Sequence, residues 1–272
     1  MKRTVFFVSD HTAITAETFG RSLLSQFEAV TFERVTLPFV DSEAKATETC
    51  RQIADAFARD GQPPLVFSTL TDGHLRRILE RSEAVAFDLF EAFLDRMETA
   101  LGQSSAHAVG RAHGLSNAAL GRGRVEALKF AIDCDDGIGI DAYDQADVVL
   151  IGVSRSGKTP ACLFLALHYG IKAANYPLTE EDLDLSALPP SLRKHRGRLF
   201  GLTMNPERLH QLREERRPAS RYASLDRCRN EIRAADALFR TAGIPFLDTS
   251  TMSVEEIAAN ILHRGGLRRM QW

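Results

Sequence analysis

DVVLIGVSRSGKT, residues 147–159, joins a run of apolar residues to a glycine-rich turn. The run at 148–152 has the length and the β-branched content of a buried parallel strand. Residues 152–159 match G-x-x-x-x-G-K-[ST] at every fixed position, and an apolar helical segment follows at 161–167. A strand, this loop and a helix in that order predict a phosphate-binding loop in an α/β sheet. An accidental glycine-rich turn is the weaker interpretation.

Each fixed position of this loop has a physical role in binding phosphate. Glycine allows backbone torsions that turn successive N–H groups into one concavity, and the helix that follows directs its positive dipole end to the same place. Lys158 supplies a compact positive charge, and the Thr159 hydroxyl is a predicted Mg²⁺ ligand. The predicted nucleotide-binding residues are Gly152, Val153, Ser154, Arg155, Ser156, Gly157, Lys158 and Thr159.

Strand-like and helix-like segments alternate through the rest of the chain, as in parallel sheets built from β–α–β units. The strand-like runs lie at residues 4–9, 32–37, 64–70, 84–90, 148–152, 172–175, 198–204 and 244–250. We therefore predict an α/β protein with mostly parallel sheets flanked by helices. Glycine-rich and polar stretches at 102–123 and 133–147 interrupt the rhythm. We place the domain boundary in the second of these stretches, near residues 140–146, between an N-terminal α/β domain (1–143) and a P-loop-type nucleotide-binding domain (144–272).

The composition argues against several classes of protein. A hydrophobic fraction of 44% with 26% charged residues is ordinary for a soluble globular protein. No apolar segment approaches the ~20 residues that span a bilayer. The four cysteines are scattered without CxxC spacing, as in reduced cytosolic proteins. We expect a cytoplasmic protein with no membrane segment.

Positive charge is concentrated in one segment. The net charge is −2, yet residues 191–233 hold 12 Lys and Arg against 5 Asp and Glu. This segment either faces an anion or forms a solvated helical face. Nucleic-acid binding is not predicted, because the chain is slightly acidic and the basic segment lacks aromatic platforms. Candidates for a bidentate phosphate clamp are Arg213, Arg216, Arg217 and Arg221, with an exposed charged helix end as the alternative.

The acidic partner that P-loop enzymes usually carry is not obvious. The strand at 198–204 ends without an acid, and Asp248, after the last strand, suits either a metal or a turn cap. Asp133, Asp135 and Asp136 lie just before the P-loop strand, where a carboxylate can accept a hydroxyl proton. We predict Asp136 as this catalytic base, beside the catalytic Lys158. The alternative is that the three acids only close a turn.

A second candidate site lies near the N-terminus. Ser9, Asp10, His11 and Thr12 occupy a strand-to-helix turn, where ligands often bind in open α/β sheets. Capping and turn formation are the alternatives for Thr12 and Asp10.

With these residues in place, the chain resembles the bacterial phosphoenolpyruvate synthase regulatory proteins, relatives of the pyruvate, phosphate dikinase regulatory proteins. The resemblance runs along nearly the whole chain. It is carried by strings that include SDHTAITAETFGRSLLSQF (9–27), DDG (135–137), GVSRSGKTP (152–160), AANYPL (173–178), GLTMNPERL (201–209) and REERRPASRYAS (213–224). One departure is His11, where the family typically has glycine; if that turn needs a positive φ, histidine fits it less well.

The resemblance implies a bifunctional serine/threonine kinase and phosphorylase. Proteins of this family use ADP to phosphorylate a threonine of phosphoenolpyruvate synthase, which inactivates it. They reverse the modification with inorganic phosphate and release pyrophosphate. ADP, with Mg²⁺, is therefore the expected cofactor, and phosphoenolpyruvate synthase and inorganic phosphate are the expected partners. The sequence does not predict the oligomeric state.

Two other functions remain open. One is a P-loop kinase or NTPase that acts on a small metabolite, and the other is a non-catalytic adaptor that senses a nucleotide. Phosphate transfer from ADP to the synthase, compared with transfer to small acceptors, separates the three.

Overall fold

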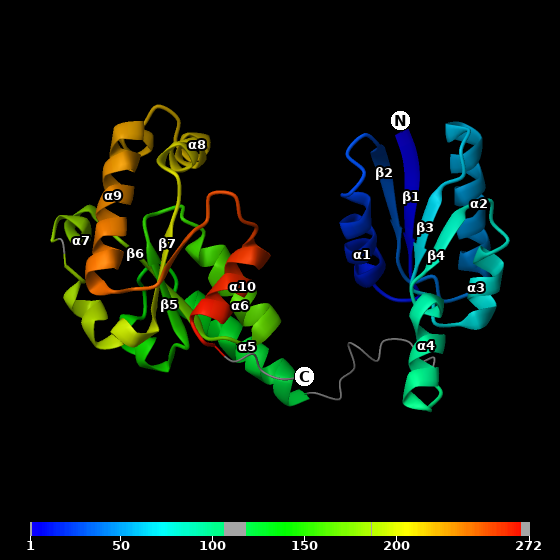
Figure 1. The fold of residues 1–272 in the computed structure, drawn as a ribbon, viewed down its shortest axis with the longest axis horizontal. Coiled ribbons are helices and arrows are strands. Elements are labelled where there is room, and N and C mark those ends of the chain that lie inside the picture. Colours follow the sequence, from blue (N-terminus) through cyan, green and yellow to red (C-terminus); the bar gives the residue numbers. More distant parts are fainter. Residues whose placement is uncertain (1, 106–117, 186, 268–272) are drawn as a thin grey trace. The chain divides into compact units, whose positions relative to one another are not determined.

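The computed structural model describes residues 2–105, 118–185 and 187–267. Contacts between residues divide the chain into two units, Met1–Gly114 and Leu115–Trp272, each with one sheet (Figure 1). This division falls earlier than the boundary after residue 143 that the sequence suggested. The reason is helix α5 (Ala118–Asp133), which contacts helix α6 (Lys158–Tyr169) and strand β6 (Ala173–Pro177) of the second unit.

The first unit is a four-stranded parallel sheet in the order β2-β1-β3-β4. The strands are β1 (Lys2–Val8), β2 (Thr31–Leu37), β3 (Leu65–Ser68) and β4 (Val85–Asp88). The helices are α1 (Ile14–Leu24), α2 (Glu43–Asp60), α3 (Gly73–Leu79) and α4 (Glu91–Leu101). Figure 1 shows α1 on one face of the sheet and α2 with α3 on the other.

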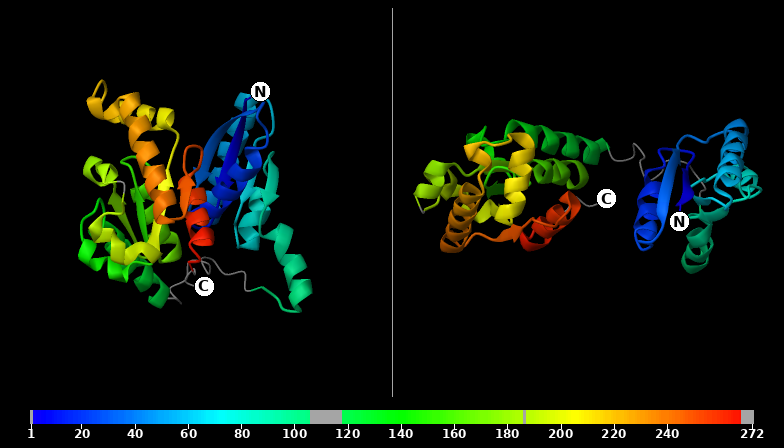
Figure 2. Two further views of the ribbon diagram at one scale, coloured as in Figure 1. Left: turned by 60° about the vertical axis from the view of Figure 1, so that its left-hand side comes forward. Right: turned by 90° about the horizontal axis from the view of Figure 1, so that it is seen from above.

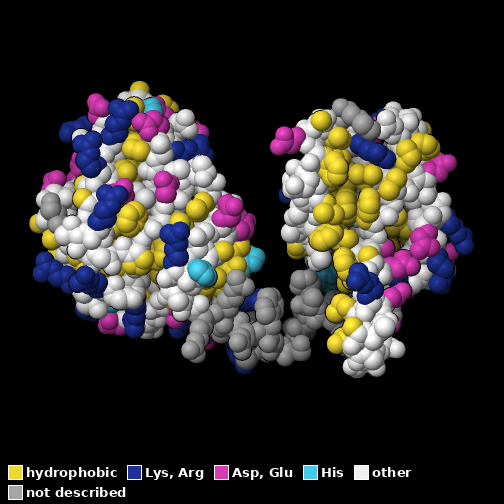
Figure 3. Space-filling view, viewed as in Figure 1, with side chains coloured by type: hydrophobic (Ala, Val, Ile, Leu, Met, Phe, Trp, Pro, Cys, Tyr) yellow, Lys and Arg dark blue, Asp and Glu magenta, His cyan; other side chains and the backbone are white. Residues whose placement is uncertain are grey.

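The two faces of this first sheet are covered unequally. Phe6 and Val8 pack in a large cluster with buried residues of α2 and α3. On the α1 side the buried cluster is smaller, although Gly20 lets the helix approach so closely that a Cβ there would lie 2.5 Å from the Phe7 ring. Val85 and Phe87 of β4 stay 42% exposed. Hydrophobic side chains accordingly gather on one face of this unit (Figure 3).

The second unit is also a four-stranded parallel sheet, in the order β6-β5-β7-β8. Its other strands are β5 (Val148–Gly152), β7 (Leu199–Thr203) and β8 (Phe246–Asp248). Its remaining helices are α7 (Glu180–Asp184), α8 (Pro206–Arg216), α9 (Leu225–Ala242) and α10 (Val254–Arg264), with short 3-10 segments η3 (Ile140–Gln145), η4 (Pro190–Arg198) and η5 (Arg221–Ala223). Helices lie on both faces of the sheet (Figure 2).

Successive side chains of β5 point to opposite faces of the sheet, and both faces are buried. Leu150 faces a buried cluster with α5, α6 and α10, whereas Val149 and Ile151 face one with α8 and α9. A parallel strand buried on both faces needs a continuous apolar run. The predicted α/β class with mostly parallel sheets flanked by helices is therefore confirmed.

The two sheets have the same topology. In each unit the first strand is central, its following helix leads to the edge strand on one side, and the third and fourth strands continue on the other side. The turn after β1, which contains Ser9–Thr12, is thus the topological counterpart of the P-loop after β5. Among the described helices, none has both the length and the apolar content to cross a bilayer.

Candidate active site

The P-loop joins the carboxyl end of the central strand β5 to the start of α6, as predicted. Gly152 packs so tightly against β7 that a Cβ there would overlap the carbonyl oxygen of Leu202. Gly157, directly before α6, has a φ of 91°, which strongly favours glycine. Gly152 is thus required because the backbone of β7 lies too close for a Cβ, and Gly157 because of its positive φ. The loop ends at the N-terminus of α6, and helix N-termini attract anions.

Lys158 lies folded across the loop. Its side chain is buried, with the residue only 5% exposed, and Nζ donates a hydrogen bond to the carbonyl oxygen of Val153 at 2.9 Å. Burial lowers the pKa of Lys158 to about 8, and nearby Asp136 and Asp135 oppose this shift. The ammonium group is therefore incompletely compensated, and an anion bound in the loop would stabilise its charge.

Thr159 contacts an acid from outside the loop. Its hydroxyl donates to Oδ1 of Asp135 at 2.9 Å. Asn175 of β6, which is fully buried, donates its amide to the same carboxylate oxygen. The Asn175 side-chain oxygen accepts from the backbone N–H of Asp136 at 3.2 Å, and its carbonyl accepts from Gly137 at 3.0 Å. Strand β6 thus holds the 135–137 turn beside the P-loop.

The oxygen donors at this place suit Mg²⁺. A threonine hydroxyl and one or two carboxylates, completed by phosphate and water, are its usual protein environment. Thr159 and Asp135, whose side chains are in contact, supply donors of this kind. Within the described part of the chain, no group of three or more His, Cys, Asp or Glu side chains is placed to hold a metal by itself.

A cleft of about 450 Å³ opens over the loop. The 135–137 turn and the P-loop form one side, and helix α8 contributes the other. Its lining residues are Asp136, Ser154, Arg155, Gly157, Lys158, Thr159, Pro160, Leu212, Glu215 and Arg216. The cleft therefore combines the loop that the sequence predicts to bind phosphate, an exposed carboxylate and further cationic groups.

The side chain of Arg213 joins α8 to the P-loop by a hydrogen bond outside the cleft. It is fully buried, and Nη2 donates to the Ser154 carbonyl at 3.3 Å and to Glu231 at 2.6 Å. Its guanidinium lies 4.2 Å from the ring centroid of Tyr222, whose hydroxyl is 2.9 Å from Ser154 Oγ. Arg227 also pairs with Glu231, at 2.7 Å. This buried cluster couples α8 and α9 to the loop.

Comparison with known proteins decides the family. A family model described as kinase/pyrophosphorylase matches residues 5–262. The chain belongs to this family. It is 50% identical over 269 residues to a protein of Marinobacter nauticus, covering 99% of both chains, and 50% identical over 268 residues to one of Halorhodospira halophila, covering 98% of both. A protein of Legionella pneumophila is 47% identical over 269 residues, again covering 99% of both chains.

Each of these relatives bears, provisionally, the name phosphoenolpyruvate synthase regulatory protein. The resemblance read from the sequence strings is thereby confirmed. Membership of the kinase/pyrophosphorylase family also supports a phosphotransferase activity, in agreement with a P-loop beside carboxylates.

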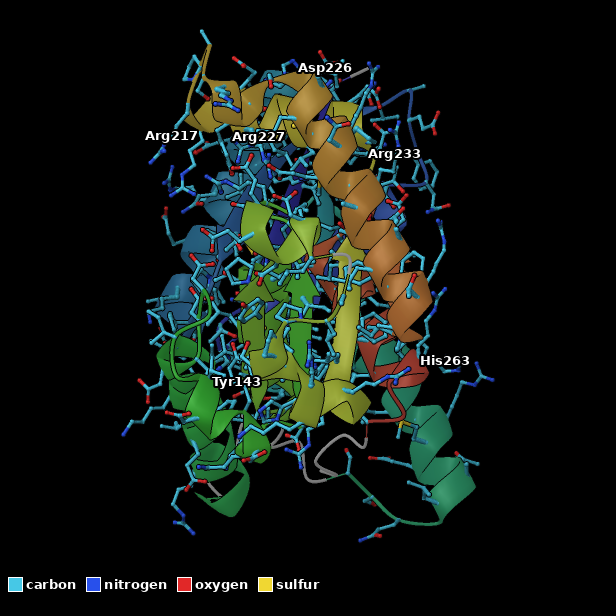
Figure 4. The ribbon with its side chains drawn as sticks, turned by 90° about the vertical axis from the view of Figure 1, so that its left-hand side faces the viewer. Tyr143, Arg217, Asp226, Arg227, Arg233 and His263 are labelled. Carbon is cyan, nitrogen blue, oxygen red and sulfur yellow. The ribbon has the colours of Figure 1, made fainter. Side chains whose placement is uncertain are left out.

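The structure separates the four arginines predicted as a phosphate clamp. Arg216 lines the cleft, but Arg213 is buried behind the loop. Arg221 lines a different pocket, between α7 and α9. Arg217 follows α8 at the periphery of the second unit (Figure 4). A clamp made of all four is not formed, because residues on one short helix and its following turn point in different directions.

The three candidate acids also differ. Asp135 contacts Thr159, Asp136 lines the cleft with a φ of 51°, and Asp133 is exposed at the end of α5. Asp248 accepts hydrogen bonds from the backbone N–H and the hydroxyl of Ser250. It therefore caps a turn, which is the second of the two roles considered for it. Sequence reasoning overlooked Asn175; its signal was a single polar side chain in a buried apolar strand.

The N-terminal turn is built around Asp10. Its carboxylate is buried and accepts from the backbone and hydroxyl of Thr71, at 2.7 and 2.6 Å. The positive φ in this turn falls on Ala13, at 61°, and His11 is not among the residues with positive φ. Histidine in place of the family's usual glycine is therefore compatible with the backbone here.

Proposed function

We propose that this chain is a bifunctional serine/threonine kinase and phosphorylase that regulates phosphoenolpyruvate synthase. In this proposal it inactivates the synthase by ADP-dependent phosphorylation of a threonine and reactivates it by phosphate-dependent removal of that group, with release of pyrophosphate. The observation that carries the proposal is the cleft, where a P-loop, Lys158 and Asp136 meet in a chain whose family is kinase/pyrophosphorylase. The names of the relatives support the choice of protein substrate.

In the proposed complex the P-loop binds the diphosphate of ADP. Backbone N–H groups of residues 152–159 and the N-terminus of α6 surround the phosphates, and Lys158 exchanges its bond to Val153 for a phosphate oxygen. Thr159 and Asp135 would hold Mg²⁺, which supplies neutralisation of phosphate charge. The arrangement favours a transition state in which negative charge accumulates on the leaving group.

For the kinase direction we assign the base role to Asp136. The threonine oxygen attacks the β-phosphorus of ADP, the bond from that phosphorus to the bridging oxygen breaks, and AMP leaves with the electron pair. The Asp136 carboxylate accepts the hydroxyl proton. Asp136 suits this role better than Asp135, because it is exposed in the cleft, whereas Asp135 already accepts from Thr159 and Asn175.

For the reverse direction we propose the same cleft. An oxygen of inorganic phosphate attacks the phosphorus of phosphothreonine, the bond to the threonine oxygen breaks, and that oxygen takes up a proton. The products are pyrophosphate and unmodified threonine. A Lys158→Ala variant should lose both reactions; loss of the kinase with intact phosphorolysis would show that the two reactions use different pockets.

The proposal is tested with ADP labelled in its β-phosphate. Purified phosphoenolpyruvate synthase should acquire label on threonine only when the chain is present, and inorganic phosphate should then release the label as pyrophosphate. Transfer to small acceptors but not to the synthase would instead indicate a metabolite kinase. Nucleotide binding without transfer to any acceptor would indicate a nucleotide-sensing adaptor.

A further inference from the structure

Two arginine side chains in the cleft have no role in the scheme above. Arg155 and Arg216 both line it, and both are exposed. Within the described residues, neither guanidinium forms a hydrogen bond or an ion pair. An arginine that has no protein partner and faces a cleft already built for anions is available to a ligand.

The backbone at Arg155 is in an unusual conformation. Its φ is 79°, in the left-handed region that disfavours residues with a Cβ. Glycine would be the default residue for this position of the loop. Residues with strained backbones cluster at ligand-binding sites. Here the strained position carries the cationic side chain of Arg155, which lines the cleft.

Arg216 is placed by the way α8 is anchored. Arg213, three residues earlier, is fixed by the Ser154 carbonyl and by Glu231. Leu212, Glu215 and Arg216 are spaced so that they share one face of the helix, and all three line the cleft. The helix therefore presents Arg216 toward the loop from a rigid support.

Among the residues that line the cleft, the cationic side chains of Arg155, Lys158 and Arg216 outnumber the carboxylates of Asp136 and Glu215. The loop N–H groups, the helix dipole and Lys158 already serve one chain of phosphates. Arg155 and Arg216 add two planar guanidinium groups, each of which can donate two parallel hydrogen bonds to phosphate oxygens. The carboxylates that line the same cleft are those of Asp136 and Glu215.

We propose that Arg155 and Arg216 form a second anion subsite, which binds a phosphate group separate from those of the nucleotide. This inference deepens the proposed function, and it rests on it for one point: the reverse reaction needs two phosphate groups side by side. The occupant is either inorganic phosphate or the phosphoryl group on the modified protein side chain.

The test compares the full-length chain with Arg155→Gln, Arg216→Gln and the double variant. Arg217→Gln is the matched control, because it removes an exposed arginine one residue beyond α8 that does not line the cleft. Binding of inorganic phosphate is measured by calorimetry in the presence of saturating ADP, and ADP binding is measured alone.

We expect the wild type to bind phosphate while ADP is bound. Each cleft variant should weaken phosphate binding by about tenfold and change ADP affinity by no more than about twofold, and the control should change neither. Phosphate binding that is unaffected in the double variant would overturn the subsite. An equal loss of ADP affinity would also overturn it, since the arginines would then belong to the nucleotide site.

Kinetics of dephosphorylation distinguish the two occupants. A raised KM for inorganic phosphate in the variants assigns the subsite to free phosphate, whereas a raised KM for the phosphorylated protein assigns it to the modified side chain. The binding experiments need no protein substrate. They can therefore succeed even if transfer to the synthase fails, which separates this inference from the proposed function.

Discussion

The buried ammonium group of Lys158 has an unusual balance of forces. It donates to the Val153 carbonyl within its own loop, and burial lowers its pKa from 10.5 to about 8. Because this folded-state pKa is depressed, the unfolded chain binds more protons between these two values. The lysine's contribution therefore makes the free energy of unfolding rise with pH in that window.

Nucleotide binding should reverse this shift, because a bound phosphate favours the charged lysine. We expect binding of ADP at about pH 8 to take up about half a proton per site, and ADP affinity to fall as the pH rises further. Calorimetry in two buffers with different ionisation enthalpies measures the uptake. Lys158→Met should bind ADP more weakly and show no such uptake. An ADP affinity that stays constant from about pH 7 to about pH 9.5 would contradict the role of the lysine.

Asp136 offers a second prediction about one residue. Asp136→Asn should lower the kinase rate by about 10²–10⁴-fold with little change in ADP affinity, because general bases contribute to the transition state. Asp133→Asn is the control, since that carboxylate is exposed at the end of α5, close in sequence. Rates are measured by label transfer from ADP. A near-normal rate in Asp136→Asn would show that another group accepts the proton.

Among the elements, α8 contacts the P-loop through the buried side chain of Arg213. Arg213 contacts the loop carbonyl of Ser154, the Tyr222 ring and Glu231. Glu231 is 11% exposed at its side chain, so its charge needs partners. Removing one member of a buried ion pair usually lowers the free energy of unfolding more than replacing both members with apolar residues does.

A double-mutant comparison separates stability from loop geometry. Arg213→Met should destabilise the chain by about 3 kcal/mol, the low end for a broken buried pair, because Arg227 still pairs with Glu231. Arg213→Met combined with Glu231→Leu should recover much of this loss but should still bind ADP weakly, since Ser154 loses its anchor. Denaturant unfolding and ADP calorimetry measure the two effects.

The control for this comparison is an exposed pair on the same helices. Arg229 contacts Glu207 at 2.9 Å with both side chains about half exposed, so Arg229→Met should cost less than about 1 kcal/mol. If the double variant bound ADP as the wild type does, the buried cluster would have no part in shaping the loop.

In the whole molecule, the P-loop cleft lies within one of the two units. All its described lining residues, from Asp136 to Arg216, belong to Leu115–Trp272, which has its own buried clusters on both faces of its sheet. The N-terminal part of this unit matters to the site, because α5 packs on α6 and the turn after α5 carries Asp135 and Asp136.

Truncation tests this organisation. A fragment of residues 115–272 should fold and bind ADP within a few-fold of the full chain, because every group that we assign to the diphosphate is present. A fragment of residues 144–272 should fail, since it lacks α5 and the acidic turn and leaves Leu165 and Ala161 of α6 uncovered on one side. Circular dichroism and calorimetry measure the outcome. Equal folding and binding by both fragments would support the later boundary.

Local patterns predicted much of the fold and part of the site. The apolar runs marked the strands within a few residues, for example 172–175 for β6 and 198–204 for β7. Helix ends were less accurate: the apolar helical segment at 161–167 marked only the middle of α6, which runs from Lys158 to Tyr169. Short turns beside helix ends share the same polar composition, so periodicity does not separate them.

By itself, the sequence determined the loop between β5 and α6, the parallel α/β class and the family resemblance. These depend on residues that are neighbours in the chain: two glycines, a lysine and a threonine between a strand and a helix. Only the tertiary structure decided that Asp135 contacts Thr159, that Asn175 holds the acidic turn, and that Arg216 lines the cleft while Arg213 is buried behind it. These contacts join residues distant in sequence, and the order of strands and the packing of helices bring them together.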